Sequence, residues 1–150
     1  MIIRNGSLFE CKEGIMVHGV NCMGVMGAGI AQEVKARWPK EFVLYREKCQ
    51  TSDDLLGTII VSPLEQYSAK DKRILIHAFT QRTYGREAYA SYDAIDECFL
   101  KISRMMSPAG LNKIHFPMIG CGLGKRDWSV VKAIIDLRIP SIYEKNLWIP

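Results

Sequence analysis

Two kinds of segment alternate along the chain. Short apolar runs without a polar face predict buried strands, and longer stretches with apolar residues three or four positions apart predict amphipathic helices. The expected strands cover residues 1–5, 15–20, 58–62, 73–79, 113–116 and 147–149. The expected helices cover residues 28–38, 40–50, 87–106 and 129–137. Such alternation of strands and helices is typical of a layered α/β domain.

Composition narrows the class without identifying a function. The 150 residues suit one domain, spanning 1–150, and this length can bury a core without disulfides or metal. Hydrophobic residues make up 48% and charged residues 24%, which excludes a disordered chain. The net charge of +4 fits an anionic ligand, but it serves solubility equally well and does not by itself indicate nucleic-acid binding.

The sequence favours a reducing compartment. Five cysteines are widely spaced and form no C-x-x-C pair, which argues against a disulfide framework and a zinc site: Cys11, Cys22, Cys49, Cys98 and Cys121. No apolar stretch is long enough for a membrane helix, and the N-terminus lacks the pattern of a signal peptide. We therefore expect a cytoplasmic protein, inside a host cell if viral, with no membrane association, metal or cofactor.

The first candidate site is a glycine-rich loop at residues 21–30, between an expected strand and an expected helix. Gly24, Gly27 and Gly29 permit positive φ and let a ligand approach the backbone. The N–H groups at the following helix start favour an anion such as phosphate. The glycine spacing differs from the dinucleotide fingerprint, so the alternative is a simple tight turn.

A second glycine-rich loop covers residues 117–128, again between a strand and a helix. Gly124 and Lys125 suggest a P-loop, but Ile119 and Arg126 occupy positions where that motif needs glycine and Ser or Thr. In open α/β sheets, ligands bind beyond the carboxyl ends of strands, where such loops gather. Two of these loops in one small domain suggest a diphosphate held between them.

Several side chains near the loops have two interpretations each. His18 lies in an apolar strand and is either a core residue or an acid–base catalyst. Asn21 either binds a ribose hydroxyl or forms an Asx-turn. Cys22 and Cys121 are nucleophiles or, more simply, small buried hydrophobes. Tyr84 either stacks on a ligand or is an exposed loop residue.

The stretches 18–31 (HGVNCMGVMGAGIA) and 117–124 (PMIGCGLG) resemble motifs of the macro domain family. The opening residues 3–9 and the closing residues 147–150 resemble the family's first and last strands, so the resemblance spans nearly the whole chain. It implies a three-layer α/β/α domain with a mixed, mostly parallel six-stranded sheet. It also implies ADP-ribose as the ligand.

The resemblance places Asn21 facing the distal ribose. We expect Asn21 to position that ribose and His18 to act as general acid or base, which makes them the candidate catalytic residues. The resemblance also implies these ligand-binding positions: Ser7, Leu8, Gly27, Ala28, Gly29, Ile30, Thr80, Tyr84, Ile119, Gly120, Cys121, Gly122 and Leu123.

Three positions depart from patterns within the family. Gly124 stands where protein glycohydrolases carry Asp, and Gln81 stands where the glycohydrolases carry Lys. Ser7 replaces the Asp that pairs with adenine in many members. The resemblance therefore favours a phosphatase acting on ADP-ribose 1''-phosphate. The alternatives are a glycohydrolase acting on ADP-ribosylated protein or DNA and a non-catalytic ADP-ribose-binding module. We expect a monomer.

Overall fold

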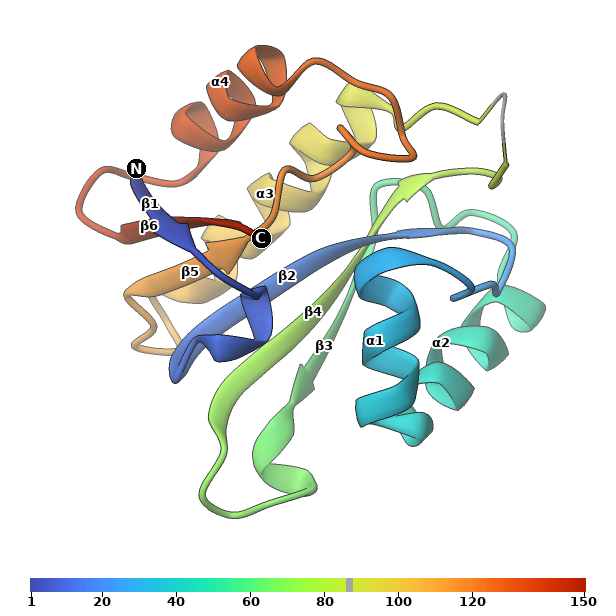
Figure 1. The fold of residues 1–150 in the computed structure, drawn as a ribbon, viewed down its shortest axis with the longest axis horizontal. Helices are drawn as coiled ribbons and strands as arrows, with labels where there is room; N and C mark the ends of the chain where they lie inside the picture. The colour runs from blue at the N-terminus through green and yellow to red at the C-terminus, as the bar shows by residue number, and fades with distance from the viewer. Residues whose placement is uncertain (86–87) are drawn as a thin grey trace.

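The computed structural model describes residues 1–85 and 88–150, which form one six-stranded sheet between two layers of helices (Figure 1). The strands are β1 (Ile2–Asn5), β2 (Glu13–Asn21), β3 (Ile59–Pro63), β4 (Lys72–Gln81), β5 (Lys113–Phe116) and β6 (Glu144–Ile149). The helices are α1 (Gly29–Arg37), α2 (Pro39–Thr51), α3 (Tyr92–Met106) and α4 (Trp128–Arg138). Two short 3₁₀ turns cover Leu8–Glu10 and Leu64–Gln66.

The strand order is β1-β6-β5-β2-β4-β3. All neighbouring strands are parallel except the antiparallel pair β3–β4 at one edge, which confirms the expected mixed, mostly parallel sheet. Because β5, β2 and β4 are adjacent and parallel, the loops that follow them leave the same end of the sheet side by side. We call this end the carboxyl edge.

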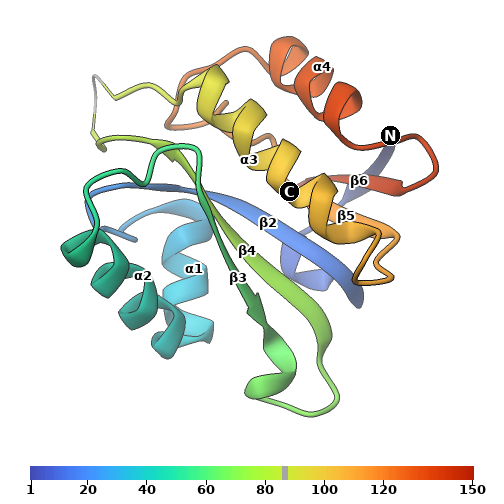
Figure 2. The same cartoon turned by 180° about the vertical axis from the view of Figure 1, so that it is seen from behind.

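Each face of the sheet is covered by one helix pair, α1 and α2 on one side and α3 and α4 on the other (Figures 1 and 2). Successive side chains of β2 alternate between the two faces, as strand geometry requires. Ile15 and Val17 pack toward α3 and α4, and Met16 and Val20 pack toward α1 and α2. β2 is therefore buried on both sides, which explains its apolar sequence.

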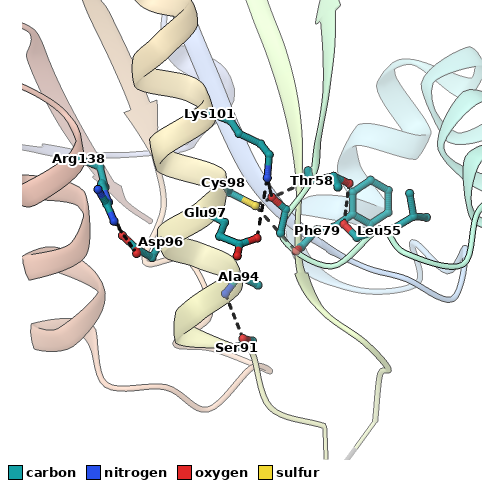
Figure 3. A network of polar contacts seen from close by, with 11 residues as sticks. Leu55, Thr58, Phe79, Ser91, Ala94, Asp96, Glu97, Cys98, Lys101 and Arg138 are labelled. Atoms are coloured by element: carbon teal, nitrogen blue, oxygen red, sulfur yellow. Dashed lines mark hydrogen bonds and ion pairs between the residues drawn. The ribbon is translucent and has the colours of Figure 1, made fainter.

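Helix α3 is tied to its surroundings by polar contacts along its length (Figure 3). Ser91 caps its first turn by accepting a hydrogen bond from the Ala94 N–H at 3.1 Å. Asp96 accepts two hydrogen bonds from Arg138 of α4, at 2.6 and 2.9 Å. Lys101 donates to the Gly57 carbonyl at 2.7 Å, joining α3 to the segment before β3. These contacts fix where α3 begins relative to the carboxyl edge.

One predicted helix boundary is wrong. The expected helix over 87–106 begins at Tyr92, and residues 88–91 form part of the loop that enters it. The cap by Ser91 sets this start, because its side chain accepts a hydrogen bond from the first turn of the helix. Residues 86–87 lie outside the described part of the chain. Within the described ranges, none of the helices has the length and apolar character needed to cross a membrane.

Candidate functional site

Backbone hydrogen bonds join the three loops of the carboxyl edge to one another. The Cys22 N–H, in the first glycine loop, lies 3.0 Å from the Gln81 carbonyl and 3.2 Å from the Arg82 carbonyl after β4. The Ala90 N–H, just before α3, donates to the Gly124 carbonyl in the second glycine loop at 3.1 Å. The loops predicted to form the site are therefore joined by hydrogen bonds and lie side by side.

The first glycine loop ends in an uncapped helix N-terminus. Helix α1 begins at Gly29, and its N-cap residue Ala28 has no side chain that can accept a hydrogen bond from the first turn. Gly27, Ala28 and Gly29 are exposed. Exposed N–H groups at the positive end of a helix dipole favour an anionic ligand.

The glycines of this loop differ in their backbone requirements. Gly24 and Gly29 have φ of +78° and +58°, where glycine is favoured, but Gly27 does not have positive φ. A Cβ on Gly27 would meet only Val25, at an ordinary 3.6 Å. The backbone therefore needs glycine at 24 and 29, and Gly27 leaves open space beside the loop.

Asn21 organises the first glycine loop. Its Oδ1 accepts a hydrogen bond from the Met23 N–H at 2.9 Å, which is the Asx-turn alternative, and its Nδ2 donates to the Val25 carbonyl at 2.9 Å. The Tyr45 hydroxyl, from α2, lies 2.8 Å from the same Oδ1 and 2.6 Å from the Asn21 carbonyl. With Oδ1 occupied, the second Nδ2 hydrogen is what Asn21 can offer a ribose hydroxyl.

Tyr45 was not recognised in the sequence. It is fully buried, and its ring stacks against Phe79 and His77, with centroids 5.8 and 6.4 Å apart. The sequence signal that could have found Tyr45 is its distance from Glu41. The two residues lie four positions apart on one helix, so both face the sheet.

The second glycine loop folds tightly on itself. Gly120 has φ of +75°, and a Cβ on Gly124 would lie 2.7 Å from the Gly120 carbonyl oxygen, so neither position accepts a side chain without movement. Lys125 has φ of +59° and is the one non-glycine residue of the described chain in the left-handed region. Strained backbone of this kind is common at ligand-binding loops.

The other predicted residues of this loop differ in exposure. Ile119 is buried and anchors the loop in the core, whereas Leu123 is 72% exposed. Gly122 has open space around it and does not have positive φ. The Cys121 thiol donates to the Ile119 carbonyl, and burial raises the pKa of Cys121. Burial also raises the pKa of Cys22, so both cysteines are protonated thiols rather than ready nucleophiles.

His18 lies in the core, away from solvent. Its side chain is buried under α2, and its Nε2 lies 2.7 Å from Nδ1 of His77 on the neighbouring strand. Burial, followed by the proximity of His77, holds the pKa of His18 well below its usual value. An acid–base role near neutral pH needs contact with substrate and a pKa near the working pH. The structure therefore favours the core alternative for His18.

The buried pair continues to a carboxylate. Nε2 of His77 lies 2.8 Å from Oε1 of Glu41, and the Tyr67 hydroxyl donates to Oε2 of Glu41. Burial raises the pKa of Glu41, but hydrogen bonds from His77, Ser62 and Tyr67 outweigh burial and leave it below its usual value. Since Glu41 is ionised, His77 donates from Nε2, and its Nδ1 accepts from His18. Nδ1 of His18 is then an acceptor, and among the described residues it has no partner. We call these residues the His–His–Glu network.

Four further predicted residues lie around the carboxyl edge or close to the first strand. The Ser7 hydroxyl accepts from the Phe9 N–H and caps the first 3₁₀ turn, and the Leu8 side chain is buried. Thr80 is buried at the end of β4, where its hydroxyl occupies the space that a Cβ on Gly19 would need. Tyr84 is 57% exposed on the loop after β4.

Across residues 1–85 and 88–150, no three His, Cys, Asp or Glu side chains gather as metal ligands.

Fold and site together define an α/β/α domain with an exposed, uncapped helix N-terminus at the carboxyl edge of its sheet. A sequence model of the family described as "Macro domain" matches residues 17–135. The chain therefore belongs to the macro domain family, as the two glycine-rich motifs predicted.

Curated proteins of several kinds are similar in sequence to this chain. An uncharacterized 17.5 kDa protein of enterobacteria phage T4 is 31% identical over 127 residues, covering 81% of this chain and 77% of its own length. An ADP-ribose 1''-phosphate phosphatase of Meyerozyma guilliermondii is 25% identical, covering 87% of this chain and 89% of its own length. A DNA ADP-ribosyl glycohydrolase of Mycobacterium tuberculosis is 27% identical over 128 residues, which cover 85% of this chain. The chain spans only 35% of the length of that glycohydrolase.

Solved structures agree on the fold. The macrodomain of Mycobacterium tuberculosis DarG superimposes with a TM-score of 0.79 at 26% identity, covering 99% of this chain and 98% of the other. The macrodomain of Thermus aquaticus DarG gives a TM-score of 0.82 at 22% identity, covering 99% of both chains.

Proposed function

We propose that this macro domain binds ADP-ribose at the carboxyl edge and removes the phosphate from ADP-ribose 1''-phosphate. The observation that carries the proposal is the exposed, uncapped N-terminus of α1 beside a second, tightly folded glycine loop. The phosphatase named among the relatives matches this chain over 89% of its own length. A whole-length match of this kind supports a shared activity better than a match to one part of a larger protein.

The diphosphate would bind to backbone rather than to side chains. Gly27, Ala28 and Gly29 present N–H groups without a side-chain cap, and open space lies beside Gly27 and Gly122. Backbone donors aimed at a bound anion are already in place before the ligand arrives, which favours binding.

The reaction would be attack of water on the phosphorus of the 1''-phosphate. The bond from phosphorus to the ribose oxygen breaks, and ADP-ribose and inorganic phosphate leave. Asn21 would hold the distal ribose through its remaining Nδ2 hydrogen. Gln81, which donates to the Thr83 carbonyl at 2.6 Å, lies beside Asn21 in the strand register and could orient the water. His18 is not part of this scheme.

A second candidate is removal of ADP-ribose from DNA. The DNA ADP-ribosyl glycohydrolase of Mycobacterium tuberculosis matches 85% of this chain, and the macrodomain of Mycobacterium tuberculosis DarG shares its fold. Gln81, in place of the Lys of the glycohydrolase patterns, weighs against this candidate. A third possibility, binding without turnover, predicts a ligand but no product.

One comparison of substrates tests all three. The protein is incubated with ADP-ribose 1''-phosphate, ADP-ribosylated DNA and ADP-ribosylated protein, and released phosphate or ADP-ribose is measured. We expect phosphate release from the first, and ADP-ribose itself to bind in the micromolar range, roughly −8 kcal/mol, raising the melting temperature. The Gly27→Glu variant, which places a carboxylate beside the diphosphate, should lose both. No thermal shift at millimolar ADP-ribose would contradict the proposed ligand.

A further inference from the structure

A cavity opens at the carboxyl edge, next to the proposed ADP-ribose site. Its volume is about 440 Å³, within the range of small-ligand pockets, and its lining includes Arg82, Tyr89, Ser91, Asp93 and Arg126. We call it the Arg82–Arg126 pocket. It lies between the loop after β4, the start of α3 and the end of the second glycine loop.

Two residues that line this pocket are hydrogen-bonded through their backbones to the glycine loops of the proposed site. The Arg82 carbonyl lies 3.2 Å from the Cys22 N–H of the first glycine loop. The Arg126 N–H donates to the Gly120 carbonyl of the second at 2.7 Å. The pocket therefore borders both glycine loops that are proposed to hold the ligand.

Arg126 is held in place before any ligand binds. Its Nε donates to the Ala90 carbonyl, and its guanidinium carbon lies 4.7 Å from the ring centre of Tyr92 and 5.3 Å from that of Tyr89. Within the described chain, the other N–H groups of this guanidinium form no hydrogen bond. A guanidinium fixed by stacking loses little freedom when it binds an anion bidentately.

The charge around the pocket favours an anion. Arg82 and Arg126 line it, and Lys125 lies with its Nζ 5.4 Å from the Tyr89 ring centre. Asp93 is the acidic lining residue, and it sits in the first turn of α3, whose N-terminus is the positive end of the helix dipole.

We propose that the Arg82–Arg126 pocket binds the phosphate group attached to the distal ribose of the substrate. This inference rests on the proposed function and names a subsite for it. The phosphate is the monoester of ADP-ribose 1''-phosphate or, if the substrate is modified DNA, a backbone phosphodiester. In both cases the recognised group is a phosphate, held by two guanidiniums.

The test compares ligands with and without that phosphate. In the Arg82→Gln variant, the KM for ADP-ribose 1''-phosphate should rise about tenfold, while the Kd for ADP-ribose should change less than twofold. Arg104→Gln, on the exposed last turn of α3, changes the net charge equally and should leave both constants unchanged. Arg126→Lys keeps the charge but loses the planar fork, so it should show the same selective loss.

The outcomes separate the subsite from the function. A selective loss on ADP-ribose 1''-phosphate supports a monoester subsite, and one seen only with an ADP-ribosylated oligonucleotide supports a phosphodiester subsite. Equal effects on phosphorylated and unphosphorylated ligands, or none in either arginine variant, would overturn the pocket assignment even if the wild type binds ADP-ribose. Failure of the wild type to bind ADP-ribose would overturn the proposed function as well.

Discussion

The two faces of the sheet are built in different ways. Between the sheet and the α3/α4 pair, the core is a continuous apolar cluster that includes Phe99, Ile102 and Phe116. Between the sheet and the α1/α2 pair, the core contains the His–His–Glu network. In the described chain, no buried histidine or carboxylate lies on the α3/α4 face. Apolar packing alone holds one layer, whereas the other combines an apolar cluster with directional hydrogen bonds.

This difference matters because the layer that contains the buried hydrogen bonds also carries the proposed binding loop. Glu41 fixes α2 to β4, and one turn later Tyr45 reaches Asn21 in the first glycine loop. Apolar packing tolerates small shifts that keep volume constant, whereas a hydrogen-bonded network has one satisfied arrangement. The network therefore fixes the position of the loop more closely than packing alone would.

The largest effect is expected on the apolar face. Phe99→Ala should lower the free energy of unfolding by about 4 kcal/mol, since it leaves a cavity at a fully buried ring. The loss, measured by urea unfolding, should be the same at pH 7 and pH 5.5. Phe99→Leu, which leaves a smaller cavity, should cost clearly less. A pH-dependent loss would contradict a purely apolar layer.

A smaller loss is expected when the network loses its carboxylate. Glu41→Gln keeps the shape but replaces a charged acceptor of three hydrogen bonds, so unfolding should become easier by about 2 kcal/mol. The matched control is Glu47→Gln, on the exposed side of the same helix, which should stay within about 0.5 kcal/mol of the wild type. Equal effects of the two substitutions would show that the network contributes nothing specific.

Acid should destabilise the network face selectively. His18 has a folded pKa well below 6.5, so below that pH the unfolded state binds more protons and unfolding is favoured. The free energy of unfolding should fall from about pH 6.5 downward by at most about 1.4 kcal/mol per pH unit for this one group. Glu41, with its lowered pKa, adds a further loss below about pH 4.5. Urea titrations from pH 7.5 to 4 measure both, and a flat profile above pH 5 would exclude a neutral buried His18.

The smallest effect on stability, with the clearest effect on function, is expected for Tyr45→Phe. Losing the hydroxyl should cost about 1 kcal/mol of stability. It should also lower turnover, because Asn21 loses a partner that holds its side chain. Tyr67→Phe removes a hydroxyl that donates to Glu41 and does not contact Asn21, so this variant should keep its rate per folded molecule. Equal rates for the two variants would contradict a positioning role for Tyr45.

The structure also changes what Asn21→Ala should do. From the sequence, we expect this variant to lose turnover more than affinity. Because the Asn21 side chain also holds the turn through Met23 and Val25, its removal should weaken ADP-ribose binding as well. Tyr45→Phe is therefore the cleaner measure of ribose orientation.

Much of the fold could be predicted because its signals are local. The apolar run of β2 and the glycine-rich motifs each lie within a short stretch of chain. In the structure, β2 and the two loops after β2 and β5 are where these patterns predict them. The start of α3 was predicted too early because the capping role of Ser91 was overlooked.

The rest depends on contacts that no local pattern contains. His18 and His77 are 59 residues apart, and Glu41 is 36 residues from His77. A histidine inside each of two apolar strands could have suggested that they pair, but not which helix supplies the carboxylate. The stacking of Arg126 on Tyr89 and Tyr92 is equally non-local, so the sequence could not predict the pocket beside the proposed site.

The register of the two central strands gives the histidine pair a further consequence. His18 and His77 are direct partners in the β2–β4 alignment. The neighbouring residues Val17 and Ile76 are both apolar, so they distinguish less sharply between alignments than the polar histidine pair does. A slip of one residue would turn His77 toward the α3/α4 core and leave both imidazoles without partners. During folding, only the native alignment of β2 and β4 brings the two imidazoles into hydrogen-bonding contact. The pair therefore favours that alignment over neighbouring ones.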